Sequence, residues 1–252
     1  MRRLLPLLAV LGLLLTLAPA AAVEPPPTGT DVDYQLGGDR SVPDTVGIVV
    51  RDRTSAPVPG RYNVCYVNGF QTQPDEKRWW RRHAELLLHH RGRPVVDEAW
   101  GEWLLDIRTP GKRERLAGIV GRWTRGCARS GFDAVEYDNL DAFTRSGGLL
   151  TKHQTVAYAR LLVRGAHRAG LAAGQKNLAG FDGTRVGYDF AVAEECGRYR
   201  ECDAYTDVYG DRVLAIEYRR PDFRWTCERY GDRLAVVLRD LDVSPRGVRA
   251  WC

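Results

Sequence analysis

From residue 46 onward, the chain alternates short apolar runs with longer stretches that have helical spacing. The runs are rich in β-branched and aliphatic residues, as is typical of parallel strands buried on both faces. We expect strands at residues 46–50, 63–67, 103–107, 132–137, 171–175, 190–194, 213–218 and 234–238. The run at residues 33–36 is a ninth candidate.

The intervening stretches carry the period of amphipathic helices. Thr151 and Gln154 have the spacing of a Thr-x-x-Gln capping box, which predicts a helix start, and Tyr158, Leu161 and Leu162 supply an apolar stripe after it. An earlier stretch places five apolar side chains on one helical face: Leu116, Ile119, Val120, Trp123 and Cys127.

Repeated alternation of strand and helix within one domain predicts an α/β fold, a single-domain (β/α)8 TIM-type barrel. Because there are nine candidate strands and the barrel has eight, the sequence does not decide which candidate lies outside the barrel. An open doubly wound sheet that binds a dinucleotide is disfavoured, because residues 36–38 lack the spacing of the glycine-rich fingerprint and open no helix.

The first 22 residues have the three-part layout of a secretory signal peptide. Arg2 and Arg3 precede a leucine-rich stretch at residues 4–17, and small residues follow at 18–22. As a membrane helix, this stretch would be short and would lack a basic stop-transfer flank. We therefore expect cleavage, secretion without stable membrane insertion, a proline-rich leader at residues 23–30, and the folded domain at residues 31–252.

The charge balance argues against a nucleic-acid-binding protein, and the cysteine content fits an exported protein. Without Arg2 and Arg3, 35 basic residues face 32 acids, and the arginines are scattered along the chain, so no nucleic-acid partner is expected. The six cysteines should pair in an oxidising compartment, with fifteen possible connectivities. Closeness in sequence favours Cys196 with Cys202 and Cys227 with Cys252, which leaves Cys65 with Cys127.

Acidic residues stand where the predicted strands end. In a barrel, these ends converge on one mouth, and unpaired carboxylates are costly to bury, so the acids predict a site there. Buried ion pairs with Arg108, Lys176 and Arg219 are an alternative for any single acid. The strand-end acids are Asp52, Asp106, Glu136, Asp138, Glu194, Glu195 and Glu217.

Two carboxylates from different strands are what the cleavage of a glycosidic bond requires. One donates a proton to the leaving oxygen, and the other attacks the sugar or activates water. A calcium site made by Glu136, Asp138 and Asp141 is a weaker alternative, because the spacing is not that of a calcium loop. No other metal site is expected. Aromatic residues that could stack on sugars are Tyr34, Trp100, Trp103, Tyr137 and Tyr218.

The motifs at these positions resemble one known family. "YQLGG" at 34–38, "GEWLLDIR" at 101–108, "GFDAVEYDNLDAF" at 131–143, "GQKN" at 174–177, "DFAVAEEC" at 189–196 and "AIEYRR" at 215–220 together look like glycoside hydrolase family 114, the endo-α-1,4-polygalactosaminidases. The resemblance implies a secreted barrel that cleaves galactosamine-containing polysaccharide within the chain, without a cofactor.

The resemblance also implies roles for individual residues. Asp138 and Glu194 become the catalytic pair, with Asp138 as nucleophile or base and Glu194 as acid. Glu195 is a rival for the role of Glu194, because the two are adjacent in the motif and only one can face the mouth. The substrate-binding residues are then expected to be Tyr34, Asp52, Asp106, Glu136, Asn139, Asp141, Lys176, Asn177, Glu217 and Tyr218.

An acidic mouth favours a cationic substrate. Deacetylated galactosamine polymers carry ammonium groups, so we expect a partly deacetylated amino-sugar polysaccharide as the partner. The alternative is a secreted barrel that binds amino sugars without cleaving them, because fold alone does not establish catalysis.

Overall fold

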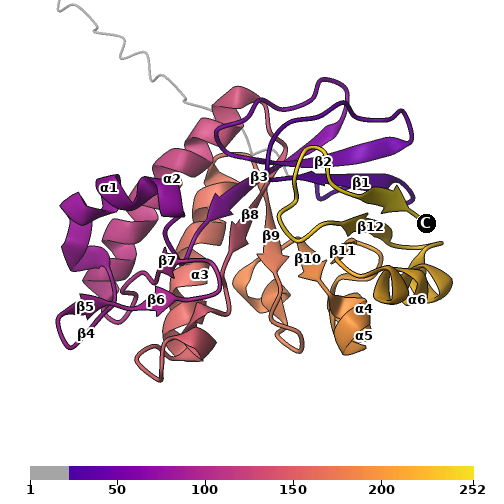
Figure 1. The fold of residues 1–252 in the computed structure, drawn as a ribbon. Helices are drawn as coiled ribbons and strands as arrows, with labels where there is room; N and C mark the ends of the chain where they lie inside the picture. Colours follow the sequence, from indigo (N-terminus) through magenta and orange to yellow (C-terminus); the bar gives the residue numbers. More distant parts are fainter. Residues whose placement is uncertain (1–22) are drawn as a thin grey trace, which may run out of the picture.

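Eight parallel strands form a nearly closed barrel in the computed structural model, which describes residues 23–252 (Figure 1). The strands follow one another around the sheet in chain order, each hydrogen-bonded to the next. This confirms the predicted fold class. The barrel strands are β1 (Asp31–Gln35), β2 (Val46–Asp52), β3 (Tyr62–Asn68), β8 (Ala134–Asp138), β9 (Ala172–Lys176), β10 (Phe190–Glu194), β11 (Val213–Glu217) and β12 (Ala235–Arg239).

The first and last parallel strands, β1 and β12, lie near each other without pairing, and beside this seam the sheet ends in a ninth strand, β13 (Arg249–Trp251). It runs antiparallel to β12. On its other side, Trp251 Nε1 donates a 2.7 Å hydrogen bond to the carbonyl oxygen of Val32 in β1, and Arg249 forms an ion pair with Asp33. The barrel is thus closed at this seam mainly by side chains.

The prediction of a barrel strand at residues 103–107 is wrong, and the candidate at 33–36 is a barrel strand instead. Residues 69–109 form an insertion in which Leu104 and Leu105 make isolated antiparallel bridges to Gln71 and Leu87. An apolar run shows that a segment is buried, but it does not show which sheet the segment joins. The insertion contains two hairpins: β4 (His89–His90) with β5 (Arg93–Pro94), and β6 (Val96–Asp97) with β7 (Glu102–Trp103).

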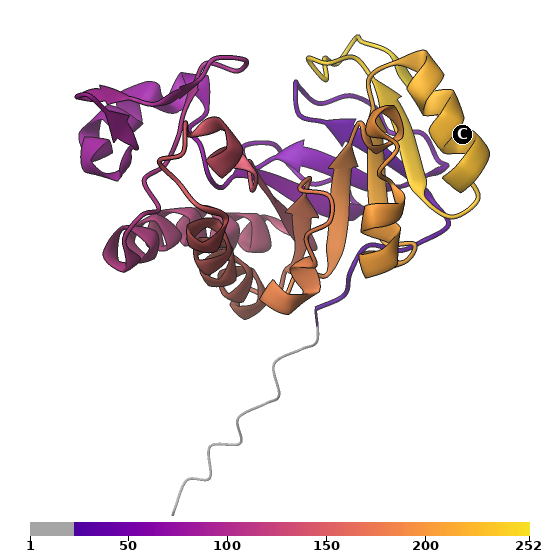
Figure 2. The ribbon, with the colours of Figure 1, turned by 90° about the horizontal axis from the view of Figure 1, so that it is seen from below.

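Helices cover only part of the barrel, as Figure 2 shows. The loops at residues 36–45 and 53–61 contain no helix, so the expected alternation fails at the first two connections. The predicted helices are present, and Thr151 and Gln154 form the predicted capping box. The α-helices are α1 (Lys77–Trp80), α2 (Pro110–Ser130), α3 (Lys152–Arg168), α4 (Cys196–Tyr199), α5 (Asp203–Tyr209) and α6 (Arg220–Tyr230); the 3₁₀ helices are η1 (Pro74–Glu76), η2 (Arg81–Leu86), η3 (Ala142–Arg145) and η4 (Gly183–Val186).

Side chains alternate along each strand between the barrel interior and the layer beneath the helices. In β10, Phe190 and Val192 belong to the interior cluster, whereas Ala191 and Ala193 belong to the outer one. Phe190 fits because β9 has a glycine opposite: a Cβ on Gly174 would lie 2.6 Å from its ring. This alternation also decides which residues at the strand ends can enter the mouth.

The structure contains the three expected disulfides: Cys65–Cys127, Cys196–Cys202 and Cys227–Cys252. The predicted signal peptide, residues 1–22, lies outside the described residues. Within residues 23–252, no helix combines the length and the apolar character that crossing a bilayer would require.

Candidate active site

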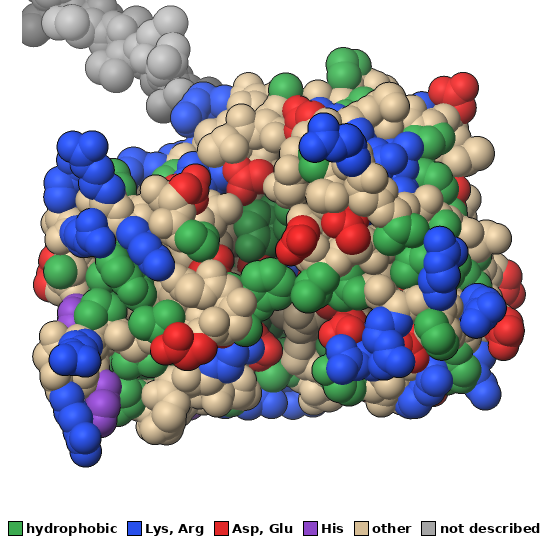
Figure 3. Space-filling view, viewed as in Figure 1, with side chains coloured by type: hydrophobic (Ala, Val, Ile, Leu, Met, Phe, Trp, Pro, Cys, Tyr) green, Lys and Arg blue, Asp and Glu red, His purple; other side chains and the backbone are tan. Residues whose placement is uncertain are grey.

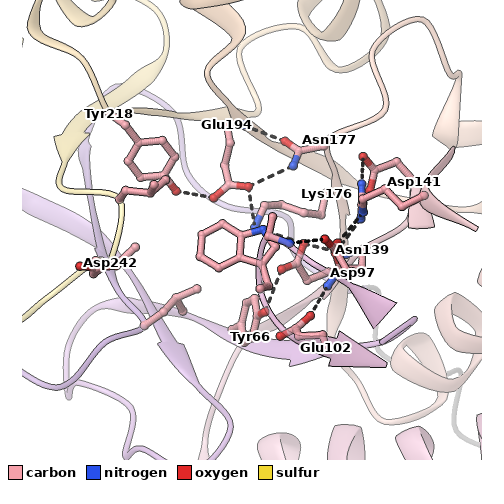
Figure 4. A pocket seen from close by; sticks show the side chains of 17 residues that line it. Tyr66, Asp97, Glu102, Asn139, Asp141, Lys176, Asn177, Glu194, Tyr218 and Asp242 are labelled. Carbon is pink, nitrogen blue, oxygen red and sulfur yellow. Dashed lines mark hydrogen bonds and ion pairs between the residues drawn. The ribbon is translucent and has the colours of Figure 1, made fainter. Parts of the chain in front are cut away.

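A cavity of about 380 Å³ opens at the carboxyl ends of β8, β9 and β10, between the insertion and the loop that follows β12. Acidic side chains lie around a hollow near the centre of the face in Figure 3. Two cations, Arg145 and Lys176, are outnumbered among the lining residues (Figure 4). The carboxylates that line the cavity are Asp97, Glu102, Asp138, Asp141, Glu194 and Asp242.

Strand alternation places the central residues of this cavity. Asp138, Lys176 and Glu194 end β8, β9 and β10 at positions that continue the inward-facing series of each strand. The residue that follows each has a positive φ: 66° at Asn139, 53° at Asn177 and 57° at Glu195. Non-glycine residues with positive φ are uncommon and cluster at functional sites, where surrounding contacts hold them.

Lys176 is the electrostatic centre of the site. Its Nζ lies 3.5 Å from Asp138 Oδ1, 3.4 Å from Glu194 Oε2 and 3.4 Å from Glu136 Oε1, and only 1% of its side chain is exposed. Burial alone would lower the pKa of Lys176, but the surrounding carboxylates raise it well above its usual value. Lys176 therefore stays charged and draws the carboxylates together.

Asp138 and Glu194 lie close enough to act on one bond. Because Lys176 Nζ is near both, Asp138 Oδ1 and Glu194 Oε2 are no more than about 7 Å apart, which is within the range of glycosidase pairs. Tyr66 donates a 2.8 Å hydrogen bond to Asp138 Oδ2, and Tyr218 donates one to Glu194 Oε1. Burial, followed by the nearby carboxylates, raises the pKa of both tyrosines, so they remain neutral donors.

Asn177 fixes the other side of Glu194. Its Nδ2 donates to Glu194 Oε2 at 3.0 Å, and its Oδ1 accepts from the Glu194 amide at 2.8 Å. Glu195 points elsewhere and pairs with Arg198 at 2.6 Å. The geometry thus favours Glu194 over its neighbour as the residue that faces the cavity.

A second cation, Arg145, neutralises the wall next to Asp138. Its Nε lies 2.6 Å from Asp97 Oδ2, and its Nη1 lies 2.8 Å from Asp141 Oδ2. Its Nη2 also donates to Asn139 Oδ1 at 2.8 Å. Because Asp141 turns to Arg145 while Glu136 turns to Lys176, these acids do not form the calcium site considered as an alternative.

Glu102, which comes from the insertion, has no cationic partner among the described residues. Its Oε2 accepts hydrogen bonds from Asn68 Nδ2 at 2.9 Å and Asn139 Nδ2 at 3.3 Å, and its Oε1 accepts none from the described residues. Burial raises the pKa of Glu102 to about 7, and the charge of Asp138 adds to the shift. Glu102 thus faces the cavity as an acid without a counter-charge.

Five of the expected substrate-binding residues do not line the cavity. Tyr34 and Glu136 lie beneath it, joined by a 2.7 Å hydrogen bond and both fully buried. Asp106 lies in the insertion and pairs with Arg108 and Lys112; although burial would raise its pKa, these partners lower it to about 2. The other two are Asp52, which binds Thr54 and Gln73, and Glu217, which faces the outer layer.

Several lining residues were not singled out from the sequence, among them Tyr66, Asp97, Glu102 and Arg145. Glu102 stands in a motif that resembles the family, but nothing in the strand pattern marks it. Tyr66 shares the inward parity of its strand, which is the one signal that could have identified it.

The pH dependence of folding should report on buried Glu217. It accepts hydrogen bonds from the Gly197 amide and the Thr226 hydroxyl, and burial raises its pKa from 4.5 to about 7. Between these values the unfolded chain releases a proton that the folded protein keeps, so this contribution to stability is lost as pH rises from about 4.5 to about 7.

Urea unfolding at pH 4 and pH 8 checks this expectation. Replacing Glu217 with Gln should remove about 3 kcal/mol of the pH-dependent difference in unfolding free energy. An unchanged difference between pH 4 and pH 8 in the variant would show that Glu217 does not hold its proton in the folded state.

The barrel and its acidic mouth are those of a carbohydrate-cleaving enzyme, and comparison with known proteins gives the family. The sequence profile described as "Glycoside-hydrolase family GH114" matches residues 13–252. The chain belongs to this family and is a glycoside hydrolase. No curated protein sequence matches it.

Two solved structures share the fold. Ega3 from Aspergillus fumigatus, crystallised in complex with galactosamine, is 20% identical, with a TM-score of 0.70 over 93% of this chain and 99% of Ega3. The glycoside hydrolase domain of PelA from Pseudomonas aeruginosa is 14% identical, with a TM-score of 0.59 over 88% of this chain and 98% of that domain. At these identities, the similarity establishes the barrel architecture.

Proposed function

We propose that the protein is a secreted, endo-acting glycoside hydrolase that cleaves α-1,4 galactosaminidic bonds, with Asp138 and Glu194 as its catalytic pair. The observation that carries the proposal is the placement of these two carboxylates, no more than about 7 Å apart on the wall of one cavity. A site that only held cationic sugars would not need this spacing.

In the proposed reaction, Glu194 gives its proton to the glycosidic oxygen while the bond from that oxygen to the anomeric carbon breaks. Asp138 either attacks the anomeric carbon or takes a proton from an attacking water. Tyr66 and Tyr218 hold the two carboxylates by hydrogen bonds, and Lys176 stabilises negative charge on either one.

The lining of the cavity supports an amino-sugar substrate. Six carboxylates face two cations there, so the field favours a chain that carries ammonium groups. Trp100 at the rim is 53% exposed and offers a flat apolar face on which a sugar ring can stack. The galactosamine bound to Ega3, which shares this fold, agrees with the same substrate class.

The direct test is incubation of the purified protein with a partly deacetylated α-1,4-linked galactosamine polymer. Mass spectrometry should detect oligosaccharides of intermediate length early in the reaction, as expected for internal cleavage. Binding of the polymer without release of fragments would instead support the alternative, a non-catalytic amino-sugar-binding barrel.

Export is part of the proposal. Cleavage after residue 22 would leave the leader at residues 23–30 and the domain at residues 31–252, and the three disulfides fit an oxidising compartment. Amino-terminal sequencing of protein recovered from the culture medium should begin at Val23. Uncleaved protein that remains in the cells would contradict this part.

Glu102 should recognise the amine of the substrate, because it is the buried carboxylate in the cavity that has no cationic partner among residues 23–252. Replacing Glu102 with Gln keeps an acceptor for Asn68 and Asn139 but removes the charge. We expect KM for the deacetylated polymer to rise about tenfold, with little change in kcat.

The N-acetylated polymer is the control for Glu102, because its amide carries no charge. On this substrate, the Glu102→Gln variant and the wild type should have similar KM values. An equal loss on both polymers, or a fall in kcat alone, would assign Glu102 to positioning Asn139 instead.

A further inference from the structure

Two helices on the outside of the barrel, α2 and α3, carry a charge opposite to that of the mouth. Helices α2 and α3 lie side by side (Figure 2). Six lysines and arginines lie in α2 and four in α3, against one acid, Glu114. These two helices therefore carry a large excess of basic over acidic side chains.

A groove of about 340 Å³ runs between these two helices. Its walls include Arg125 of α2 and Arg164 and Arg168 of α3, all exposed, and Ala117 and Leu161 contribute apolar surface. Glu114 is the one acid among the residues that line it. Within residues 23–252, no acid forms an ion pair with these three arginines. This differs from the cavity, where each cation has two or more carboxylates nearby.

The arrangement is unfavourable for the protein alone. Arg160, Arg164 and Arg168 follow one another at four-residue intervals in α3, and like charges at this spacing repel and weaken a helix. An anionic partner would remove this repulsion. Arginine also binds carboxylates through two parallel hydrogen bonds, which gives such contacts direction as well as charge.

The chemistry of the groove narrows the class of partner. An inserting lipid surface is disfavoured, because the large exposed apolar side chains, Trp100, Tyr199 and Leu241, all lie outside α2 and α3. Single-stranded nucleic acid would call for exposed aromatic platforms, and those two helices expose no tryptophan, tyrosine or phenylalanine. A linear polymer with regularly spaced carboxylates matches arginines set one helical turn apart, ~6 Å.

We propose that the groove between α2 and α3 binds an acidic, uronate-containing polysaccharide through Arg125, Arg164 and Arg168. The groove is separate from the acidic cavity, so this inference does not rest on the proposed hydrolase activity. Together, the two faces allow one molecule to hold a polyanion while its cavity engages a polycation. Binding at the groove would retain the enzyme wherever the two kinds of polymer occur together.

Affinity electrophoresis of the whole protein through gels that contain a polyuronate tests the proposal. The triple substitution Arg125→Gln, Arg164→Gln and Arg168→Gln should weaken retention at least about tenfold, because three bidentate contacts are lost. A control triple changes net charge equally at exposed arginines elsewhere, Arg82→Gln, Arg93→Gln and Arg224→Gln, and should change retention less than about twofold.

Several results would overturn the proposal. Equal loss of retention in the two triple variants would show that net charge, not the groove, is responsible. Wild-type retention no greater in polyuronate than in neutral dextran would show that the surface does not bind the polymer. Tighter groove-dependent binding to double-stranded DNA or to anionic vesicles would assign another partner. Unchanged melting temperatures and unchanged hydrolysis of galactosamine polymer confirm that both variants are folded.

Discussion

Replacing Asp138 with Asn or Glu194 with Gln should lower kcat on a galactosamine polymer by about 10³-fold or more. Each change keeps the shape of the side chain and leaves an oxygen to accept the hydrogen bond from Tyr66 or Tyr218. What is lost is the group that attacks or the group that donates a proton. Initial rates of reducing-end formation measure the effect, and equilibrium binding of the polymer should survive in both variants.

Glu195 provides a matched control one residue away. The same chemical change, Glu195→Gln, removes a carboxylate that pairs with Arg198 and does not line the cavity. We expect less than a twofold loss of rate, since an exposed ion pair contributes little. If Glu195→Gln were as damaging as Glu194→Gln, or if Asp138→Asn kept most of its activity, the assignment of the pair would be wrong.

Replacing Lys176 with Met should be the most destructive single change to the fold of the site. The ammonium group lies within 3.5 Å of three carboxylates, and one of these, Glu136, is fully buried. Removing one partner of a buried ion pair leaves an uncompensated charge, which costs about 3 kcal/mol or more of unfolding free energy. Urea unfolding should show this loss, and activity should fall with it because the carboxylates repel one another.

A second substitution separates the structural role of Lys176 from its role in the reaction. Lys176→Met combined with Glu136→Gln removes the buried charge together with its partner, so much of the lost stability should return. Activity should not return, because Asp138 and Glu194 still lack their shared cation. A double variant less stable than Lys176→Met alone would mean that Glu136 is not the acid that Lys176 neutralises.

Much of the barrel could be predicted from the sequence, because buried strands read as apolar runs at regular intervals. The prediction failed for a segment that is buried but does not belong to the barrel sheet. Residues 103–107 are as apolar as a barrel strand, but Leu104 and Leu105 are buried in the insertion, whereas residues 33–36 contribute to β1. The pattern of apolar runs also did not show that the first two connections between strands lack a helix.

Prediction of the site depended on strand ends and on their parity. Asp138, Lys176 and Glu194 could be predicted from the sequence because each ends a strand at an inward-facing position. Glu217 closes a strand as well, but in the outward series. The position of Glu102 could not be predicted this way, because Glu102 ends no barrel strand and reaches the mouth only through the folding of the insertion.

The seam between β1 and β12 is the place where local opening of the barrel should begin. Elsewhere around the ring, neighbouring parallel strands are joined by backbone ladders; here the connection to β1 runs through Trp251 and Arg249. Local opening starts where fewest backbone bonds must break together, so amide protons along the outer edge of β1 should exchange with deuterium ahead of those in β8 and β9. Strands β8, β9 and β10, which carry Asp138, Lys176 and Glu194, lie across the ring from the seam, where such local opening should occur last.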